Sequence, residues 1–291
     1  MEDLVRESAV DSRSRKARRG SFGLATAGLV AILTLSGSVA IMAQPAPQAV
    51  EAKAPAHLPA ARQVLARFVK EIGGSTAFEK IQSQHMTGKF QLVAQGITGG
   101  LEVLAARPDK LLMKMNLPGI GEMSQGFDGS IGWSINPVTG PMVLDGKMLE
   151  PLREQARFDA VLHAEDEFKS METIGQETFD GKDCYKLKLV RKSGQEVTEY
   201  YEVKTGLLAG SASLEETPLG SISVTAMVGD YKKFGDVLFA TRLTQKMGPL
   251  SQLMTFEKME FNQVDNSVFA LPDQIKALVK KDAKSGPSPR P

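Results

Sequence analysis

KLLMKMNL, residues 110–117, alternates in a period of two, and its first face carries Leu111, Met113, Met115 and Leu117. Lys110, Lys114 and Asn116 lie on the other face. This alternation is typical of a strand in an antiparallel sheet with two distinct faces. The same period recurs in DCYKLKL (183–189) and ISVTAMV (222–228), so we expect sheet over much of the chain.

Short turn signals separate these strands: Asp128-Gly129, Asp180-Gly181, Ser193-Gly194, Thr205-Gly206, Phe234-Gly235-Asp236 and Gly248-Pro249. Turns of this length join neighbouring strands as hairpins. The pattern therefore predicts one large antiparallel meander. A sheet with so many strands has to curl.

Three segments have helical character. AARQVLARFVKEIGG (60–74) repeats apolar residues at helical spacing between Pro59 and Gly73. PLREQARFDAVLH (151–163), within a less regular stretch at 145–168, predicts one or two short helices with Pro151 at or near a start. LPDQIKALVK (271–280) predicts a last helix. The fold class is therefore α+β, mainly β, with a curled sheet, an N-terminal helix and a helical insertion midway.

The N-terminus has the plan of an export signal. Five basic residues lie between residues 13 and 19, and no charge occurs from Gly20 until Glu51. Residues 1–43 are expected to be either a cleaved signal peptide or a retained transmembrane anchor, since the apolar segment is about 20 residues long. Lys and Arg ahead of this segment place the rest of the chain in the periplasm. Residues 44–57 predict a Pro/Ala-rich linker, 58–280 one domain and 281–291 a disordered tail.

Composition and motifs argue against several functions. Without residues 1–43 the chain has 29 basic and 30 acidic residues, which does not suggest a nucleic-acid surface. His57, His85 and His163 have no partner at ligand spacing, and HAEDE (163–167) is expected to be a solvated acidic loop. Cys184 is expected to be an exposed structural thiol. We expect no catalytic residue, metal or cofactor.

The segment GFDGSIGWSI (126–135) predicts a hairpin that is apolar on both faces. A two-residue turn at Asp128-Gly129 would place Trp133 opposite Ser124. Met123 and Phe127 would then lie on one face, and Ile131, Trp133 and Ile135 on the other. A helix can cover one of these apolar faces, and the other apolar face needs a cover of its own. Either a layer of protein fills that space, or a cavity remains; the sequence leaves both open.

Residues 99–137 carry a resemblance in their order of motifs: Arg107-Pro108 at the end of a strand, Pro118 after the next, then Asp128-Gly129, Trp133 and Asn136-Pro137. This order resembles the LolA and LolB family of periplasmic lipoprotein carriers. V-F-A-L-P (268–272) is similar to the closing strand of that family. The resemblance covers roughly residues 58–280 and implies an unclosed half-barrel whose apolar concave face is capped by helices and holds acyl chains.

From that resemblance we expect a non-catalytic protein that binds or transfers acyl chains of lipoprotein or phospholipid in the periplasm. It would act as a monomer, with inner-membrane or outer-membrane transport proteins as possible partners. The cavity would be lined by Met113, Met115, Met123, Phe127, Ile131, Trp133 and Ile135. Arg107 would hold shut a lid formed by residues 145–168. The alternative is an envelope scaffold with a solid core and no ligand.

Overall fold

The computed structural model describes residues 58–162, 168–217 and 220–285. Their helices are α1 (Ala61–Glu71), α2 (Ser75–Glu79), α3 (Gly146–Ala156) and α5 (Asp273–Ser285), with short 3-10 helices η1 (Ala160–Leu162) and η2 (Asn266–Phe269). The strands of the first half are β1 (Ser83–Leu92), β2 (Ile97–Ala106), β3 (Lys110–Leu117), β4 (Gly121–Phe127), β5 (Gly132–Asn136) and β6 (Gly140–Leu144). Those of the second half are β7 (Phe168–Phe179), β8 (Lys182–Arg191), β9 (Glu196–Glu202), β10 (Leu208–Thr217), β11 (Gly220–Phe234), β12 (Val237–Met247) and β13 (Leu250–Phe261).

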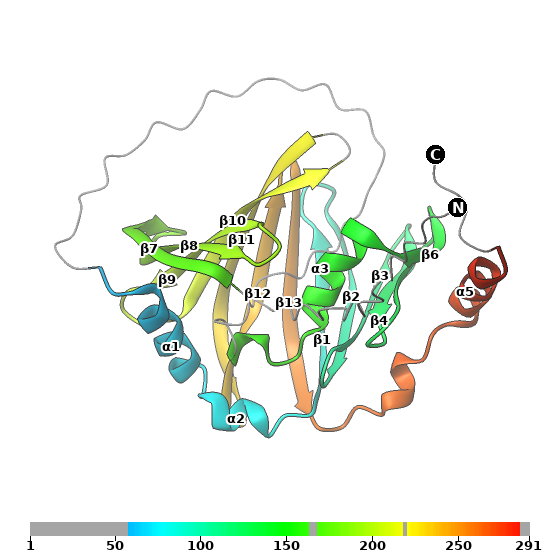
Figure 1. The fold of residues 1–291 in the computed structure, drawn as a ribbon, viewed down its shortest axis with the longest axis horizontal. Helices are drawn as coiled ribbons and strands as arrows, with labels where there is room; N and C mark the ends of the chain where they lie inside the picture. Colours follow the sequence, from blue (N-terminus) through cyan, green and yellow to red (C-terminus); the bar gives the residue numbers. More distant parts are fainter. Residues whose placement is uncertain (1–57, 163–167, 218–219, 286–291) are drawn as a thin grey trace, which may run out of the picture.

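All of these strands form one antiparallel sheet in the order β6-β5-β4-β3-β2-β1-β13-β12-β11-β10-β9-β8-β7. Every neighbour is consecutive in the chain except β1 and β13, which pair in the middle. The chain therefore runs outward from β1 to the edge strand β6, crosses to the opposite edge at β7, and returns. The sheet curls without closing, which confirms the predicted fold class (Figure 1).

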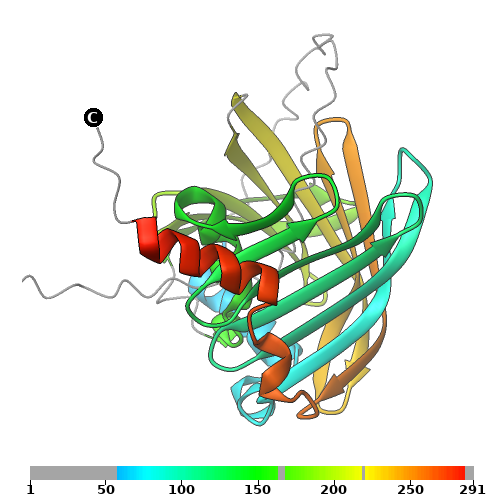
Figure 2. The same ribbon diagram turned by 90° about the vertical axis from the view of Figure 1, so that its right-hand side faces the viewer.

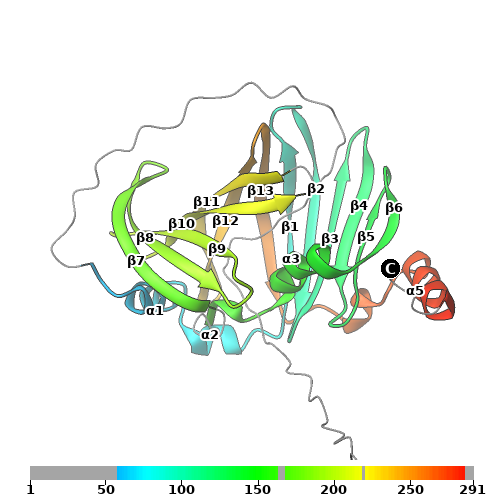
Figure 3. The ribbon, with the colours of Figure 1, turned by 45° about the horizontal axis from the view of Figure 1, so that its top comes forward.

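The insertion between β6 and β7 makes that crossing on the concave side, where α3 lies inside the curl (Figures 1 and 3). Helices α1 and α2 lie at one end of the half-barrel, and α1 buries Val64, Leu65 and Phe68. The Phe68 ring meets the Tyr201 ring edge-on at 5.4 Å. Thus α1 closes one end of the apolar interior.

The convex face has its own cover. Figure 2 shows α5 lying against the outside of the first half of the sheet. Ile275 of α5 and Phe269 of η2 join Leu104, Leu112 and Trp133 in a separate buried cluster. The sheet is therefore apolar on both sides here, and each side is covered by a different helix.

The hairpin between β4 and β5 differs from the expected register. Its turn spans residues 128–131, so Trp133 lies opposite Gly126 and not Ser124. Asp128 closes this wider turn by accepting from the backbone N–H groups of Ser130 and Ile131 at 2.8 and 2.7 Å. A Cβ atom at Gly126 would lie 2.7 Å from Cζ2 of Trp133, so the indole requires a glycine there. The assignment of side chains to the two faces is unaffected, because the register shifts by an even number of residues.

Two helix boundaries also differ. Pro151 lies inside α3, and not at its start, because the helix begins at Gly146 and includes the apolar residues Leu149 and Leu152. Helix α5 continues to Ser285, beyond residue 280 where the sequence placed the end of the domain. The signal or anchor segment, the linker and residues 286–291 lie outside the described residues.

We predict that Ile275→Ala lowers the free energy of unfolding by about 2 to 4 kcal/mol, since Ile275 is fully buried between α5 and the sheet. Trp133 is the only tryptophan, so its emission reports on this cluster and should shift to the red as α5 loosens. Val268→Ala, at an exposed position of η2, is the control and should change stability by less than about 0.5 kcal/mol. Equal effects of the two substitutions would contradict the role assigned to α5.

Candidate functional site

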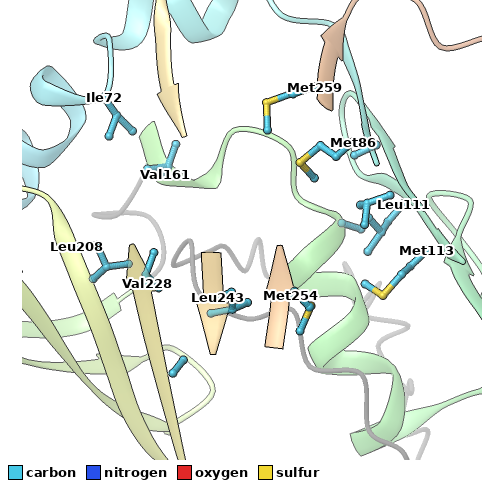
Figure 4. Close-up of a cluster of buried hydrophobic side chains, with 14 of the residues drawn as sticks. Ile72, Met86, Leu111, Met113, Val161, Leu208, Val228, Leu243, Met254 and Met259 are labelled. Atoms are coloured by element: carbon cyan, nitrogen blue, oxygen red, sulfur yellow. The ribbon is translucent and has the colours of Figure 1, made fainter. Parts of the chain in front are cut away.

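The concave wall of the half-barrel is lined by methionine and other apolar side chains. Met113, Met115, Met123 and Phe127, four of the predicted cavity residues, all belong to the cluster of buried residues on this side. Met86, Met254 and Met259 join them from β1 and β13 (Figure 4). Methionine is unbranched and polarizable, so this wall can adapt to differently shaped apolar groups.

The other three predicted cavity residues do not share that wall. Trp133 belongs to the convex cluster under α5, and Ile135 packs against the same cluster. Ile131 lies in the turn before β5 and is half-buried. The grouping of all seven residues around one cavity is therefore corrected, because alternate residues of a strand point to opposite faces. Trp133 stabilises the outer helix and does not line the interior.

The insertion covers the concave wall at short range. Leu149 and Leu152 of α3 reach β5 so closely that a Cβ atom at Gly132 would lie 2.3 Å from Cδ1 of Leu149. Leu152 and Ala156 of α3 and Val161 of η1 are part of the concave cluster. The insertion is thus an apolar cover that pairs with no strand. Residues 163–167, the last part of the predicted lid, lie outside the described residues.

Arg107, at the C-terminal end of β2, links three parts of the structure. Its Nε and Nη2 donate to the backbone carbonyls of Ile81 and Phe78, at 2.8 and 3.1 Å. Its Nη1 donates to the Asp159 carboxylate, in the insertion just before η1. The guanidinium also lies over the Phe158 ring, 5.2 Å from its centroid. This planar fork therefore joins α2, the sheet and the cover at one point.

A second ion pair fixes the cover to the other arm of the sheet. Arg191, on the concave face of β8, lies with Nη1 3.6 Å from Oε2 of Glu154 in α3. The Arg191 guanidinium also lies over the Phe168 ring at 5.5 Å. Burial raises the pKa of the Glu154 carboxyl, and the charge of Arg191 opposes that increase. The cover is thus tied by charged groups to both halves of the half-barrel.

Sequence reasoning missed Asp159, Glu154 and Arg191. Asp159 lies 52 residues from Arg107, and no spacing rule connects a strand end with a distant insertion. A signal did exist for a polar residue of the interior: Glu199 alternates with Val197 and Tyr201, which places a carboxyl on a face that is otherwise apolar.

The groups with catalytic potential are scattered over the described residues. Among these residues no three His, Cys, Asp or Glu side chains gather as a metal site. His85 has a partner that its spacing did not reveal, since Nε2 lies 2.9 Å from Oε1 of Glu102 on β2. The HAEDE segment lies outside the described residues. Across 58–162, 168–217 and 220–285, no helix combines the length and apolar character needed to cross a bilayer.

Cys184 is buried, which corrects the expectation of an exposed thiol. It packs in one cluster with Tyr200 and Ala209, and the Tyr200 ring stacks on the Phe179 ring with centroids 4.0 Å apart. Burial, helped by the charge of Glu202, raises the pKa of the thiol to about 11. A high pKa keeps the thiol protonated, and the thiolate is the nucleophile. Cys184 is therefore structural.

The comparisons with known proteins concern the fold. No family model matches the chain, and no curated protein sequence matches it. A solved structure of a DUF1329 family protein from Desulfovibrio piger is similar, with a TM-score of 0.52 at 11% identity over 72% of this chain and 97% of that one. A LolA superfamily protein from Nitrosomonas europaea gives 0.49 at 13% identity, over 74% of this chain and 99% of that one. A Vibrio parahaemolyticus protein described as an outer membrane lipoprotein-sorting domain gives 0.49 at 15% identity, over 76% and 99%. The superfamily that the motifs resemble is among these structures.

We predict that iodoacetamide labels Cys184 in the folded protein at pH 8 at least about 100-fold more slowly than in denaturant. Burial and the pKa of about 11 leave little thiolate at that pH. Intact-mass measurement over time gives both rates, and the denatured chain is the internal control. Comparable rates would mean that the thiol is exposed and activated.

Proposed function

We propose that the protein binds the acyl chains of a lipid or lipoprotein in the bacterial periplasm, between the concave wall and the insertion that covers it. One observation carries this proposal. The apolar wall is covered by α3 and η1, which pair with no strand and are tied to the sheet by the Arg107–Asp159 and Arg191–Glu154 contacts. Moving this cover aside breaks the hydrogen bond from the Phe158 N–H to the Pro108 carbonyl, but none between two strands.

Burial supplies the binding energy in this mechanism. Each methylene moved from water to an apolar surface contributes roughly 0.8 kcal/mol. The methionine side chains on β1, β3, β4 and β13 can repack around an incoming chain. No catalytic group is needed, so the protein would act as a carrier or an acceptor. A cleaved N-terminal segment suits a diffusing monomeric carrier, and a retained one suits an anchored acceptor that exchanges cargo with membrane transport proteins.

A second candidate is an envelope interaction module with a solid core. The observation in its favour is complete burial of Met113 and Met254, both 0% exposed, with the cover in place. In that case the side chains of the protein itself fill the interior permanently, and its function would depend on an outer surface. The two candidates differ in whether the interior exchanges with lipid.

We predict that the full chain, purified from a bacterial host and extracted with organic solvent, releases acyl-bearing lipid at about one molecule per protein. Mass spectrometry of the extract identifies the lipid and its amount. The protein should also enhance the fluorescence of N-phenyl-1-naphthylamine, an apolar probe, and added lipid should reverse the enhancement. If the purified protein contains no lipid and does not enhance the fluorescence of the probe, the result would support the solid-core module.

We predict that Arg107→Leu accelerates lipid exchange by about tenfold or more, because charge-assisted hydrogen bonds contribute about 1.5 to 3 kcal/mol. Asp159→Asn, which removes only the charge on the cover, should give a smaller acceleration. Exchange is measured from the rate at which unlabelled lipid replaces a fluorescent lipid.

Arg67→Leu is the matched control for Arg107→Leu. Arg67 also donates to two backbone carbonyls, those of Val203 and Lys204 at 2.9 and 2.8 Å, but between α1 and the turn before β10. Its loss should lower stability without changing exchange. If both arginine variants exchange lipid at the rate of the unsubstituted protein, Arg107 has no part in opening.

A further inference from the structure

The concave face carries a row of residues, four of them polar, next to its apolar wall. Register fixes the row, since each member lies directly opposite the next on the neighbouring strand. From β9 to β1 the members are Glu199, Ser211, Ala226, Gln245, Gln252 and Leu92. Because the sheet curls around this face, side chains on strands far apart in the order point toward a common interior.

Glu199 and Gln245 in this row are buried, and each has a side-chain oxygen without a partner in the described part of the chain. Glu199 is 1% exposed and Gln245 is 2% exposed. Within the part of the chain that the structure describes, Oε1 of Glu199 and Oε1 of Gln245 find no hydrogen-bond partner. A buried polar group without a partner costs about 1 to 3 kcal/mol, so two such groups on one face call for an explanation.

The row lies between the apolar wall and one end of the half-barrel. An apolar row lies two residues further along the strands toward α1 and α2. It contains the opposed residues Val228, Leu243 and Met254 (Figure 4), and Phe90 lies opposite Met254. In the other direction are the turns at 93–96 and 248–249. An amphiphile with its chains toward α1 and α2 would therefore place its polar part at the row.

The chemistry of the row suits an uncharged group. Burial raises the pKa of the Glu199 carboxyl, and the hydrogen bond from the Tyr201 hydroxyl to Oε2, at 2.6 Å, only partly offsets this. A raised pKa favours the protonated carboxyl, which can donate through Oε1, while Oε1 of Gln245 can accept. One carbonyl and one N–H or O–H on a ligand would satisfy both. None of the six residues of the row is a cation, and Arg191 of β8, whose charge lowers the pKa of Glu199, is already paired with Glu154.

We propose that Glu199 and Gln245 bind the uncharged polar junction of an acyl-bearing molecule, an amide or a hydroxy ester, while its chains occupy the methionine-lined wall. This assignment rests on the proposed function and adds to it the chemical class and the orientation of the ligand. It also explains why side chains with unsatisfied oxygens lie next to the apolar wall.

The test compares two ligands in displacing N-phenyl-1-naphthylamine from the full chain: N-dodecanoylethanolamine and the alkane of the same length. Gln245→Leu removes the unsatisfied oxygen while keeping a similar volume, so it should not lower the melting temperature. It should weaken binding of the amide about five- to tenfold, since one hydrogen bond is lost. Binding of the alkane should stay unchanged or become tighter.

Thr241→Val is the matched control, on the same face of β12. The Thr241 hydroxyl is satisfied, because it donates to the Asp230 carbonyl at 2.6 Å. This variant should lose stability and keep the affinities for both ligands. If Gln245→Leu changes neither affinity, or changes both equally, the assignment of the row is overturned while the acyl container stands. If neither ligand displaces the probe from the unsubstituted protein, the proposed function is overturned as well.

Discussion

The connection from one edge of the sheet to the other is the constraint on which the rest of the structure depends. The first half of the chain winds outward from β1 to β6, and the second half winds back from β7 to β13. Because β1 and β13 pair in the middle, β6, the last strand of the first half, and β7, the first strand of the second half, lie at opposite edges of the curled sheet. The linking segment crosses on the concave side, so the topology itself places a cover over the interior (Figure 3).

That arrangement separates the two apolar faces of the sheet. Outside, α5 and Trp133 form a closed cluster in which the indole lies against Gly126. Inside, α3 and η1 contribute apolar side chains such as Leu152 and Val161, and ionic contacts through Arg107 and Arg191 fix this cover to the two arms of the sheet. Removing α5 would expose the buried side chains of the convex cluster. Moving α3 and η1 aside would expose the concave wall, whose methionine side chains can adapt to different apolar groups. The two covers therefore suit different roles, stability outside and exchange inside.

The polarity of the interior changes from one end of the half-barrel to the other. Helices α1 and α2 close one end, the apolar row containing Leu243 and Met254 comes next, and the row containing Glu199 and Gln245 lies nearer the turns at the other end. A purely hydrophobic core gains nothing from buried polar atoms without partners. An amphiphilic ligand would gain both the burial of its chains and the satisfaction of its polar junction. The order of these rows along the strands is thus a physical basis for binding a ligand in one orientation.

The sequence by itself determined the antiparallel meander, the first and last helices and the opposite faces of Met123 and Trp133. These depend on local periodicity and turn residues, which act between near neighbours in the chain. Tertiary structure decided which face meets which helix, so Trp133 proved to lie under α5 and Cys184 proved to be buried. It also decided the partners of Arg107 and Arg191, because those contacts join residues whose separation in sequence has no regular period.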